Sequence, residues 1–220
     1  MQDTESSTQC AVLSPTERLN QLTHGAGFLL SVIGGCVLIS SAIKTGGLPR
    51  IVGCAAFAIS LMLLYAASTL SHSFADPQRR KFYRTVDQIC IFILAAGSFT
   101  PFALVWADNW IGRTVLCSMW ATAVIGSLYR AIWGENSVAI AFFVVIGWLP
   151  AFSLHQVYLC SGWAGLSLVL AGGLAYTGGT WFLVRDHKQP YFHPIWHLST
   201  ILGSGLHFLF CLLYVAMPVG

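Results

Sequence analysis

Charge is scarce in this sequence. Only 9% of its 220 residues are Asp, Glu, Lys or Arg, and the formal net charge at pH 7 is +3. A soluble domain carries about 25% charged residues. The deficit argues against an ordinary soluble domain, and so small a net charge needs no nucleic-acid partner to explain it.

The chain also lacks the local patterns of a disulfide scaffold, a thiolate metal site and a secretory signal peptide. Its seven cysteines are scattered without a CxxC pair, so we interpret them as small buried packing residues. The N-terminal MQDTESSTQ is polar, and no basic segment precedes an apolar run. This argues against a cleaved signal peptide, and it leaves Cys10 without the context of a lipoprotein anchor.

Long uncharged runs dominate instead. Hydrophobic residues make up 56% of the chain, and the mean hydropathy is +0.71. A transmembrane helix needs about 20 apolar residues, and charges are costly inside it, so they collect in loops. The uncharged stretch between Glu135 and Arg185 is too long for one helix and predicts two, with a turn near residues 160–162.

We therefore predict an all-α integral membrane protein built as a seven-transmembrane helix bundle. A polar tail, residues 1–21, precedes the transmembrane domain, residues 22–217. The predicted spans are approximately residues 22–43, 51–74, 86–105, 112–133, 137–157, 163–184 and 194–217. If the N-terminus is cytoplasmic, cytoplasmic segments hold eight Lys and Arg residues and outside loops hold three. The positive-inside rule thus favours a cytoplasmic N-terminus and, with seven spans, an outside C-terminus.

Polar residues gather at the cytoplasmic ends of the second, third and seventh predicted spans. Ser68 and His72 lie four residues apart and share a helix face, as do His193 and His197, while Asp87 begins the third span. Three histidines with an open fourth position form a familiar catalytic zinc shell, and a carboxylate can orient a histidine or the bound water. These residues are therefore a candidate Zn²⁺ site.

A purely structural interpretation of these histidines stays open. An HxxxH pattern occurs by chance, and histidines within a membrane can simply form hydrogen bonds between helices. For His24 and His207, such inter-helix bonding is the better interpretation. For His155 and His187, a position at the interface or in a loop is expected.

Four motifs that span almost the whole chain resemble those of hemolysin III proteins, which belong with the progestin and adiponectin Q receptors. The motifs are Glu17-x-x-Asn20-x-x-Thr23-His24-x-x-Gly27, Ser68-x-x-x-His72, Ala96-Gly97-Ser98-Phe99-Thr100-Pro101, and His193-Pro-Ile-Trp-His197 followed by Gly203 and His207. The resemblance implies seven helices with the N-terminus inside. It also implies a zinc ion near the cytoplasmic face, held by the histidines at positions 72, 193 and 197.

The same resemblance gives Asp87 and Ser68 catalytic roles. Asp87 corresponds to the family's acidic residue that holds the water on the metal, and Ser68 to a residue that supports the site. The chain departs from the family pattern at Gln88, where a histidine is common, and at Ser71, where a tyrosine is frequent. Neither position supplies a metal ligand, so the expected zinc site is retained.

The implied function is a zinc-dependent hydrolase of lipid amides or esters, because the wider superfamily resembles ceramidases. The alternative is a non-enzymatic regulator of membrane lipid composition or fluidity with structural zinc. A hemolytic pore is weighted less because no charged pathway is evident, and a receptor rests on analogy alone. The size is similar to that of bacterial members, so we expect a multi-pass protein of the bacterial cytoplasmic (inner) membrane whose partners are membrane lipids.

Overall fold

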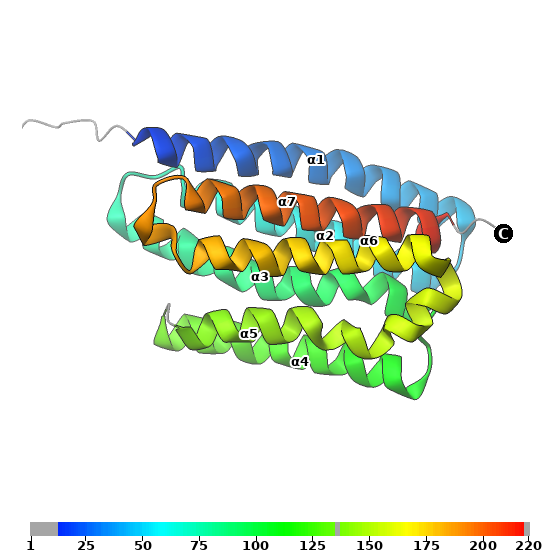
Figure 1. Ribbon diagram of the computed structural model, residues 1–220. Helices are drawn as coiled ribbons and strands as arrows, with labels where there is room; N and C mark the ends of the chain where they lie inside the picture. The colour runs from blue at the N-terminus through cyan, green and yellow to red at the C-terminus, as the bar shows by residue number, and fades with distance from the viewer. Residues whose placement is uncertain (1–12, 135–136, 218–220) are drawn as a thin grey trace, which may run out of the picture.

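The computed structural model describes residues 13–134 and 137–217, and within these ranges the regular structure is entirely helical (Figure 1). The helices are α1 (Pro15–Thr45), α2 (Leu48–Ser71), α3 (Pro77–Val105), α4 (Trp110–Trp133), α5 (Ser137–Trp148), α6 (Leu154–Leu183) and α7 (Phe192–Phe210). Two 3₁₀ segments, Leu149–Ser153 and Asp186–Lys188, link neighbouring helices, and a π-helical segment, Cys211–Ala216, continues α7. Cys10 and Glu135 lie outside the described residues.

Side-chain caps start three of the long helices. The side-chain oxygens of Ser14, Asp76 and Asn109 each accept a hydrogen bond from the backbone amide three residues further on, at 3.2, 2.8 and 2.9 Å. Each bond satisfies one of the amides that lack a partner at a helix N-terminus. Prolines follow two of these caps and suit the first turn, where no amide donor is needed.

The helices extend beyond the predicted apolar spans at several ends. α1 begins at Pro15 and not near residue 22, and α3 begins at Pro77 and not near residue 86. Hydropathy detects only the part of a helix that crosses the hydrocarbon core, whereas the helix itself continues into the polar interface. In the other direction, α2 ends at Ser71, so His72 is its C-cap residue and not part of a span that reaches residue 74.

Six helical segments of the described chain are long and apolar enough to cross a membrane. One of them, Ala141–Leu183, contains 43 residues, about twice the length that a single crossing needs. It is not a straight helix: Gly162 has φ 61° and ψ −161°, which breaks α6 near the predicted turn. Figure 1 shows the chain reversing direction between α5 and the later part of α6.

The core lies where α2 packs against both α1 and α3. Fully buried Phe57 of α2 and Phe92 of α3 are among its largest side chains. Backbones approach closely here, since a Cβ on Gly53 would lie 2.6 Å from the Cα of Pro101. Contact of this kind between helices is expected in a membrane, where van der Waals packing drives helix association.

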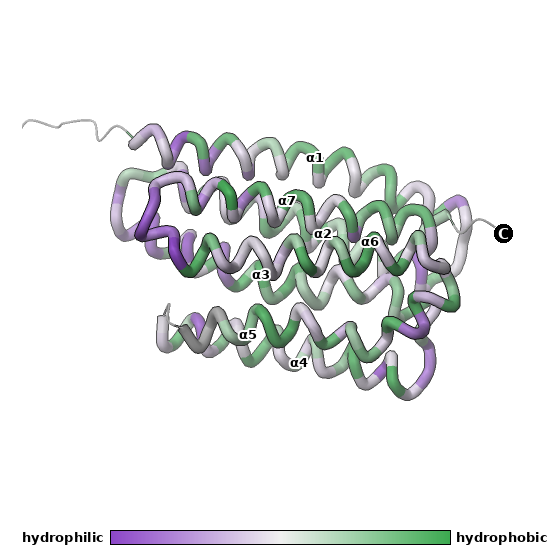
Figure 2. The backbone as a smooth tube through the Cα atoms, viewed as in Figure 1, coloured by the Kyte–Doolittle hydropathy of each residue, from purple (hydrophilic) through white to green (hydrophobic). Residues whose placement is uncertain are grey.

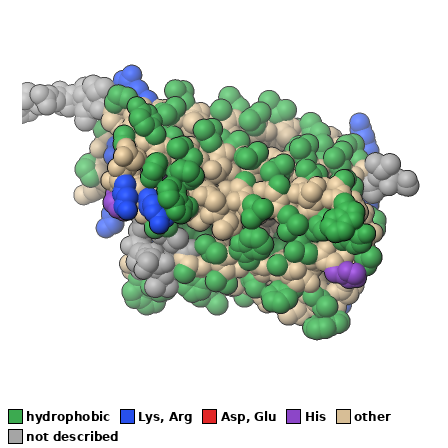
Figure 3. All heavy atoms as spheres, viewed as in Figure 1, with side chains coloured by type: hydrophobic (Ala, Val, Ile, Leu, Met, Phe, Trp, Pro, Cys, Tyr) green, Lys and Arg blue, Asp and Glu red, His purple; other side chains and the backbone are tan. Residues whose placement is uncertain are grey.

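The outer surface is apolar along the helices and polar at their ends (Figures 2 and 3). Leu22, Leu29 and Ile33 of α1 are 64–69% exposed, as suits contact with lipid. The exposed thiols of Cys36 and Cys117 share this surface, so the prediction that the cysteines are buried is wrong for these two. Both thiols lie on the lipid-facing side, where an apolar group needs no burial within the protein, and this explains their exposure.

One end of the bundle brings together the segments that sequence analysis singled out. The start of α1, the α2–α3 link and the α6–α7 link all lie at this end (Figure 1). Figure 2 shows hydrophilic residues concentrated along the α6–α7 link and near the start of α3. We call this the polar end of the bundle.

Candidate metal centre

Three histidines converge at the polar end. His72 follows the last turn of α2, while His193 and His197 lie one turn apart at the start of α7. One nitrogen from each ring lies within 4.8 Å of the corresponding nitrogens of the other two. The ring centroids are 5.1, 5.1 and 4.7 Å apart. The structure thus brings together the triad that the sequence predicted, in an arrangement that could hold a metal ion.

The His72 ring is held by a carboxylate of α1. Its Nδ1 lies 2.6 Å from Oε2 of Glu17, and the imidazole is only 2% exposed. The other oxygen of Glu17 lies 3.4 Å from Arg80 and 3.8 Å from Arg84, both on α3. Glu17 therefore fixes the ring orientation while two guanidinium groups fix Glu17.

Oxygen atoms also lie against Nδ1 of the other two histidines. Asp186, in the α6–α7 link, places Oδ2 3.1 Å from Nδ1 of His193, and this hydrogen bond lowers the pKa of the Asp186 carboxyl. Oγ1 of Thr23 lies 3.2 Å from Nδ1 of His197 and donates its own proton to backbone carbonyls of α1. With Nδ1 of each ring engaged, Nε2 remains for a metal, the arrangement typical of metal-binding histidines.

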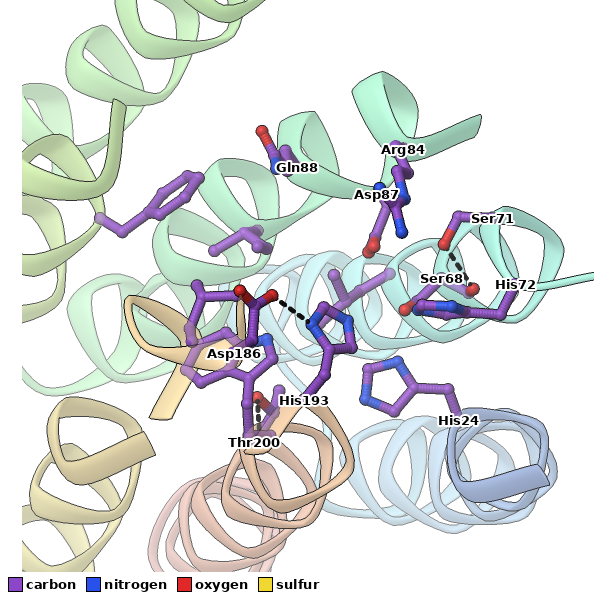
Figure 4. Close-up of a pocket in the computed structure, with 15 residues that line it drawn as sticks. His24, Ser68, Ser71, His72, Arg84, Asp87, Gln88, Asp186, His193 and Thr200 are labelled. Atoms are coloured by element: carbon purple, nitrogen blue, oxygen red, sulfur yellow. Dashed lines mark hydrogen bonds and ion pairs between the residues drawn. The ribbon is translucent and has the colours of Figure 1, made fainter. Parts of the chain in front are cut away.

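Asp87 and Ser68 border the same cavity as His72 and His193. Figure 4 shows the Asp87 carboxylate extending from α3 toward the side of the cavity where these two rings and Ser68 lie. Ser68 is fully buried, yet its Oγ has no hydrogen-bond partner among the described residues. Because an unsatisfied buried hydroxyl costs about 1–3 kcal/mol, Oγ is suited to bind a ligand or a water.

The residues present fit a metal ion on two grounds. The donor set, three imidazoles with oriented rings, is the one found in catalytic zinc sites. The buried Ser68 hydroxyl beside it lacks a partner in the described structure, so the cavity offers a polar atom to a further ligand.

The remaining histidines divide as follows. Nε2 of His207 lies 3.2 Å from the carbonyl oxygen of Val169 on α6. The predicted hydrogen bond between helices is therefore confirmed for His207. The same prediction is wrong for His24, whose ring nitrogens have no hydrogen-bond partner in the described ranges. Its ring instead stacks on His197, with centroids 3.6 Å apart and planes at 21°. His155 and His187 are exposed, as expected of interface or loop residues.

The two departures from the family pattern have local partners. Gln88 borders the cavity, and its Oε1 accepts a hydrogen bond from Nε of Arg130 on α4, a residue only 6% exposed. Ser71 is fully buried and donates to the Ser68 carbonyl at 2.8 Å. Gln88 thus links the wall of the site to a buried cation of the neighbouring helix.

Sequence reasoning gave no role to the residues that hold the rings. Glu17, Thr23 and His24 occur in the first motif, and the seven-residue interval between Glu17 and His24 places these two on one face of α1. That spacing is the signal that could have placed them beside the triad. No sequence pattern predicts that Asp186 contacts His193, because the position of Asp186 depends on how the α6–α7 link folds.

Comparison with known proteins finds a family match over most of the chain. Residues 13–208 match the family model described as Haemolysin-III related. The chain is 33% identical over 217 residues to Hemolysin-3 of Bacillus cereus, with 98% of each chain covered. It is 34% identical over 205 residues to the Hemolysin-3 homolog of Bacillus subtilis (strain 168), covering 92% of this chain and 95% of that relative. With six apolar helices long enough to span a bilayer, the chain is therefore a membrane protein that belongs to the haemolysin III family.

Proposed function

We propose that this protein is a zinc-dependent membrane hydrolase that cleaves an amide or ester bond of a lipid. The observation that carries the proposal is the histidine triad, whose rings are each fixed through Nδ1 by an oxygen atom. His72, His193 and His197 would hold the zinc ion. Three-histidine sites with an open position are typical of catalytic zinc.

We also propose seven crossings with the polar end in the cytoplasm. The length of Ala141–Leu183 and its break at Gly162 support two crossings within that segment. Eight Lys and Arg residues fall in the segments that this topology places inside, against three outside, in keeping with the positive-inside rule. The bacterial relatives support a location in the bacterial inner membrane.

Zinc, when bound, would polarise a carbonyl and lower the pKa of a water molecule to about 7. The Asp87 carboxylate is the general base in this proposal: it accepts the proton of the water that attacks the carbonyl carbon. It then delivers that proton to the amine or alcohol released when the carbon–nitrogen or carbon–oxygen bond breaks. The Ser68 hydroxyl, buried and without a partner in the described structure, donates a hydrogen bond to the developing oxyanion.

The surroundings of the triad suit a lipid. Leu64, Ile91 and Phe143 border the cavity at the triad and also a second, mostly apolar cavity between α3, α5, α6 and α7. The two cavities therefore adjoin. An acyl chain in the second cavity would place its carbonyl group beside the triad.

A structural zinc is the second candidate function. His72 and His197 are only 2% and 1% exposed, and they join the end of α2 to α7. A metal there would hold the two helices together without any reaction, in a protein that regulates membrane lipid composition or fluidity.

Metal analysis of the purified protein tests the site. We expect one zinc per chain in the wild type and loss of zinc in His72→Ala and His193→Ala. His155→Ala is the matched control, because His155 is exposed and outside the triad. Stoichiometric zinc in both triad variants would show that the site is wrongly assigned.

Lipid turnover then separates the enzyme from the structural zinc. We expect Asp87→Asn to keep zinc and fold but to lose lipid cleavage by about 10²–10⁴-fold, the usual contribution of a general base. Cleavage is followed by mass spectrometry of lipids incubated with each protein. If wild type and Asp87→Asn leave the same lipid species, the hydrolase proposal fails, and a lower unfolding temperature without zinc would favour the structural role.

A further inference from the structure

Two buried cysteines meet near the end of the bundle opposite the polar end. Cys54 of α2 is 0% exposed, and Cys211, the first residue of the π-helical segment, is 2% exposed. Both are free thiols, and their side chains form a hydrogen bond with each other. The fold alone brings these distant positions together, and neither thiol has a role in the proposed hydrolysis.

A second contact fixes the register of α2 against the π-helical segment. Nε of Arg50 donates a hydrogen bond to the carbonyl oxygen of Val215 at 2.7 Å. α2 and α7 run in opposite directions (Figure 1). A step of four residues forward from Arg50 and four residues back from Val215 therefore leads to the same level of the bundle, on the same faces of the two helices. The residues at that level are Cys54 and Cys211.

The π-helical segment is held in place by side chains of neighbouring helices. The last carbonyl groups of a helix lack partners within it. Here Oγ1 of Thr45 donates to the carbonyl oxygen of Ala216 at 2.6 Å, and Nε1 of Trp106 donates to that of Tyr214 at 2.8 Å. Together with the bond from α2, these contacts keep Cys211 on the side of the segment that faces α2.

The surroundings of Cys54 are those of a nucleophilic cysteine. Its sulfur accepts the hydrogen bond of the Cys211 thiol, and the Arg50 guanidinium acts on it electrostatically. A hydrogen-bond donor and a nearby cation stabilise the thiolate, which is the reactive form of a cysteine. Cys54 lies six residues, about 9 Å, from the start of α2, and Arg50 between them is only partly buried. A small oxidant therefore has a short path to Cys54 from this end of the bundle.

We propose that Cys54 and Cys211 are a redox-active dithiol that hydrogen peroxide converts to a disulfide between α2 and the π-helical segment. The Cys54 sulfur attacks one peroxide oxygen, the oxygen–oxygen bond breaks, and a sulfenic acid and one water form. The Cys211 sulfur then attacks the Cys54 sulfur, and the sulfur–oxygen bond breaks. The oxygen leaves with the Cys211 proton as a second water. The two thiols are thus oxidised by two electrons, and the peroxide is reduced to two waters.

The disulfide joins the same pair of helices that the triad joins at the polar end. His72 follows α2 and His197 lies on α7, so the metal centre and the dithiol hold opposite ends of one helix pair. The chemistry of the dithiol needs neither zinc nor lipid cleavage. Oxidation should therefore proceed equally with a metal chelator present.

Thiol counting and peptide mapping test the proposal. The reduced, folded protein is treated with N-ethylmaleimide to block exposed thiols and then with hydrogen peroxide in the presence of EDTA. It is next unfolded and treated with an isotopically heavy maleimide. We expect peroxide to remove two thiols from the heavy labelling. Mass spectrometry should find the peptides that carry positions 54 and 211 joined, and lighter by two hydrogen atoms than the two reduced peptides together.

The matched control is Cys90→Ser. Cys90 is also buried in the bundle, at 5% exposure on α3, but it is not part of the pair. The joined peptides should persist in Cys90→Ser and disappear in Cys54→Ser. The proposal is overturned if positions 54 and 211 stay reduced at a peroxide concentration that oxidises exposed Cys36 in unblocked protein. A bond from either position to another cysteine would overturn it as well.

Trapping of the sulfenic acid tests the order of the two steps. Cys211→Ser leaves Cys54 without the thiol that would displace its oxygen. We expect dimedone, which reacts with sulfenic acids, to label Cys54 in this variant after peroxide treatment. It should leave Cys211 unlabelled in Cys54→Ser. Labelling of Cys211 alone, or of neither cysteine, would show that Cys54 is not the nucleophile and would overturn the proposed reaction.

Discussion

Replacing Glu17 by glutamine tests whether the hydrogen-bond partner of His72 raises the affinity of the site for a metal ion. Glu17 is not a ligand itself, but it lies 2.6 Å from Nδ1 of His72 and is 16% exposed. As a carboxylate it favours the tautomer that leaves Nε2 for the metal and raises the basicity of that nitrogen. Glutamine keeps a similar shape and an acceptor oxygen but removes the negative charge.

The expected loss follows from the geometry. Removing such a partner costs about 10- to 100-fold in metal affinity, or about 1.4–2.8 kcal/mol. Because the contact between Glu17 and His72 is short and shielded from solvent, we expect the loss of metal affinity in Glu17→Gln to lie toward the upper end of this range. Asp186→Asn should cost less, because Asp186 lies 3.1 Å from its histidine and is 39% exposed, where solvent screens the charge. The order of the two losses is therefore part of the prediction.

Competition with a fluorescent zinc chelator in detergent measures both affinities. Asp108→Asn is the control, since Asp108 is 65% exposed and pairs with Arg113 at the opposite end of the bundle. The variant proteins should unfold at temperatures close to that of the wild type, because the Glu17 pairs with Arg80 and Arg84 are partly exposed. Wild-type affinity in Glu17→Gln, or a larger loss in Asp186→Asn, would refute this account of the site.

Two further predictions concern stability, measured as thermal unfolding in one detergent. Gly53→Ala should destabilise the protein by about 1–3 kcal/mol, because the added Cβ would lie 2.6 Å from the Pro101 backbone. Gly205→Ala should leave the stability unchanged, because a Cβ at Gly205 has no atom within 4 Å. Equal losses of stability in the two variants would contradict the packing argument. Gln88→Leu should cost about 1–3 kcal/mol by removing the acceptor of Arg130 Nε, whereas Gln88→Glu keeps an acceptor and should preserve stability. Equal unfolding temperatures for both Gln88 variants would mean that this bond contributes nothing.

The sequence predicts the helical membrane fold because the bilayer leaves few choices. A spanning segment must satisfy its own backbone hydrogen bonds, so each long uncharged run indicates a helix. The ends of the helices are harder to predict, since Arg79 to Arg84 belong to α3 although hydropathy excludes them. The uncharged stretch between Glu135 and Arg185 predicts a turn near residues 160–162. The structure has a 3₁₀ segment at 149–153 and a break at Gly162.

The triad was predictable because its members occur at matching depths in two sequence segments. Positions 193 and 197 are one helical turn apart, and topology brings position 72 to the same end. The partners on Nδ1 were not predictable in this way. The carboxylate at 17 is 55 residues from its histidine, and the threonine at 23 is 174 residues from its own. Such pairs depend on the rotation of α1 about its axis, which hydropathy does not determine when a helix is apolar on most sides.

Zinc-edge X-ray absorption of the purified protein tests the central claim that the histidines of α2 and α7 share one metal ion. The account predicts three imidazole nitrogens at about 2.0–2.1 Å with an additional oxygen ligand in a four-coordinate shell. It also predicts that His197→Ala loses this signature while His207→Ala keeps it. Sulfur ligands, a shell without imidazole, or an unchanged spectrum in His197→Ala would contradict it.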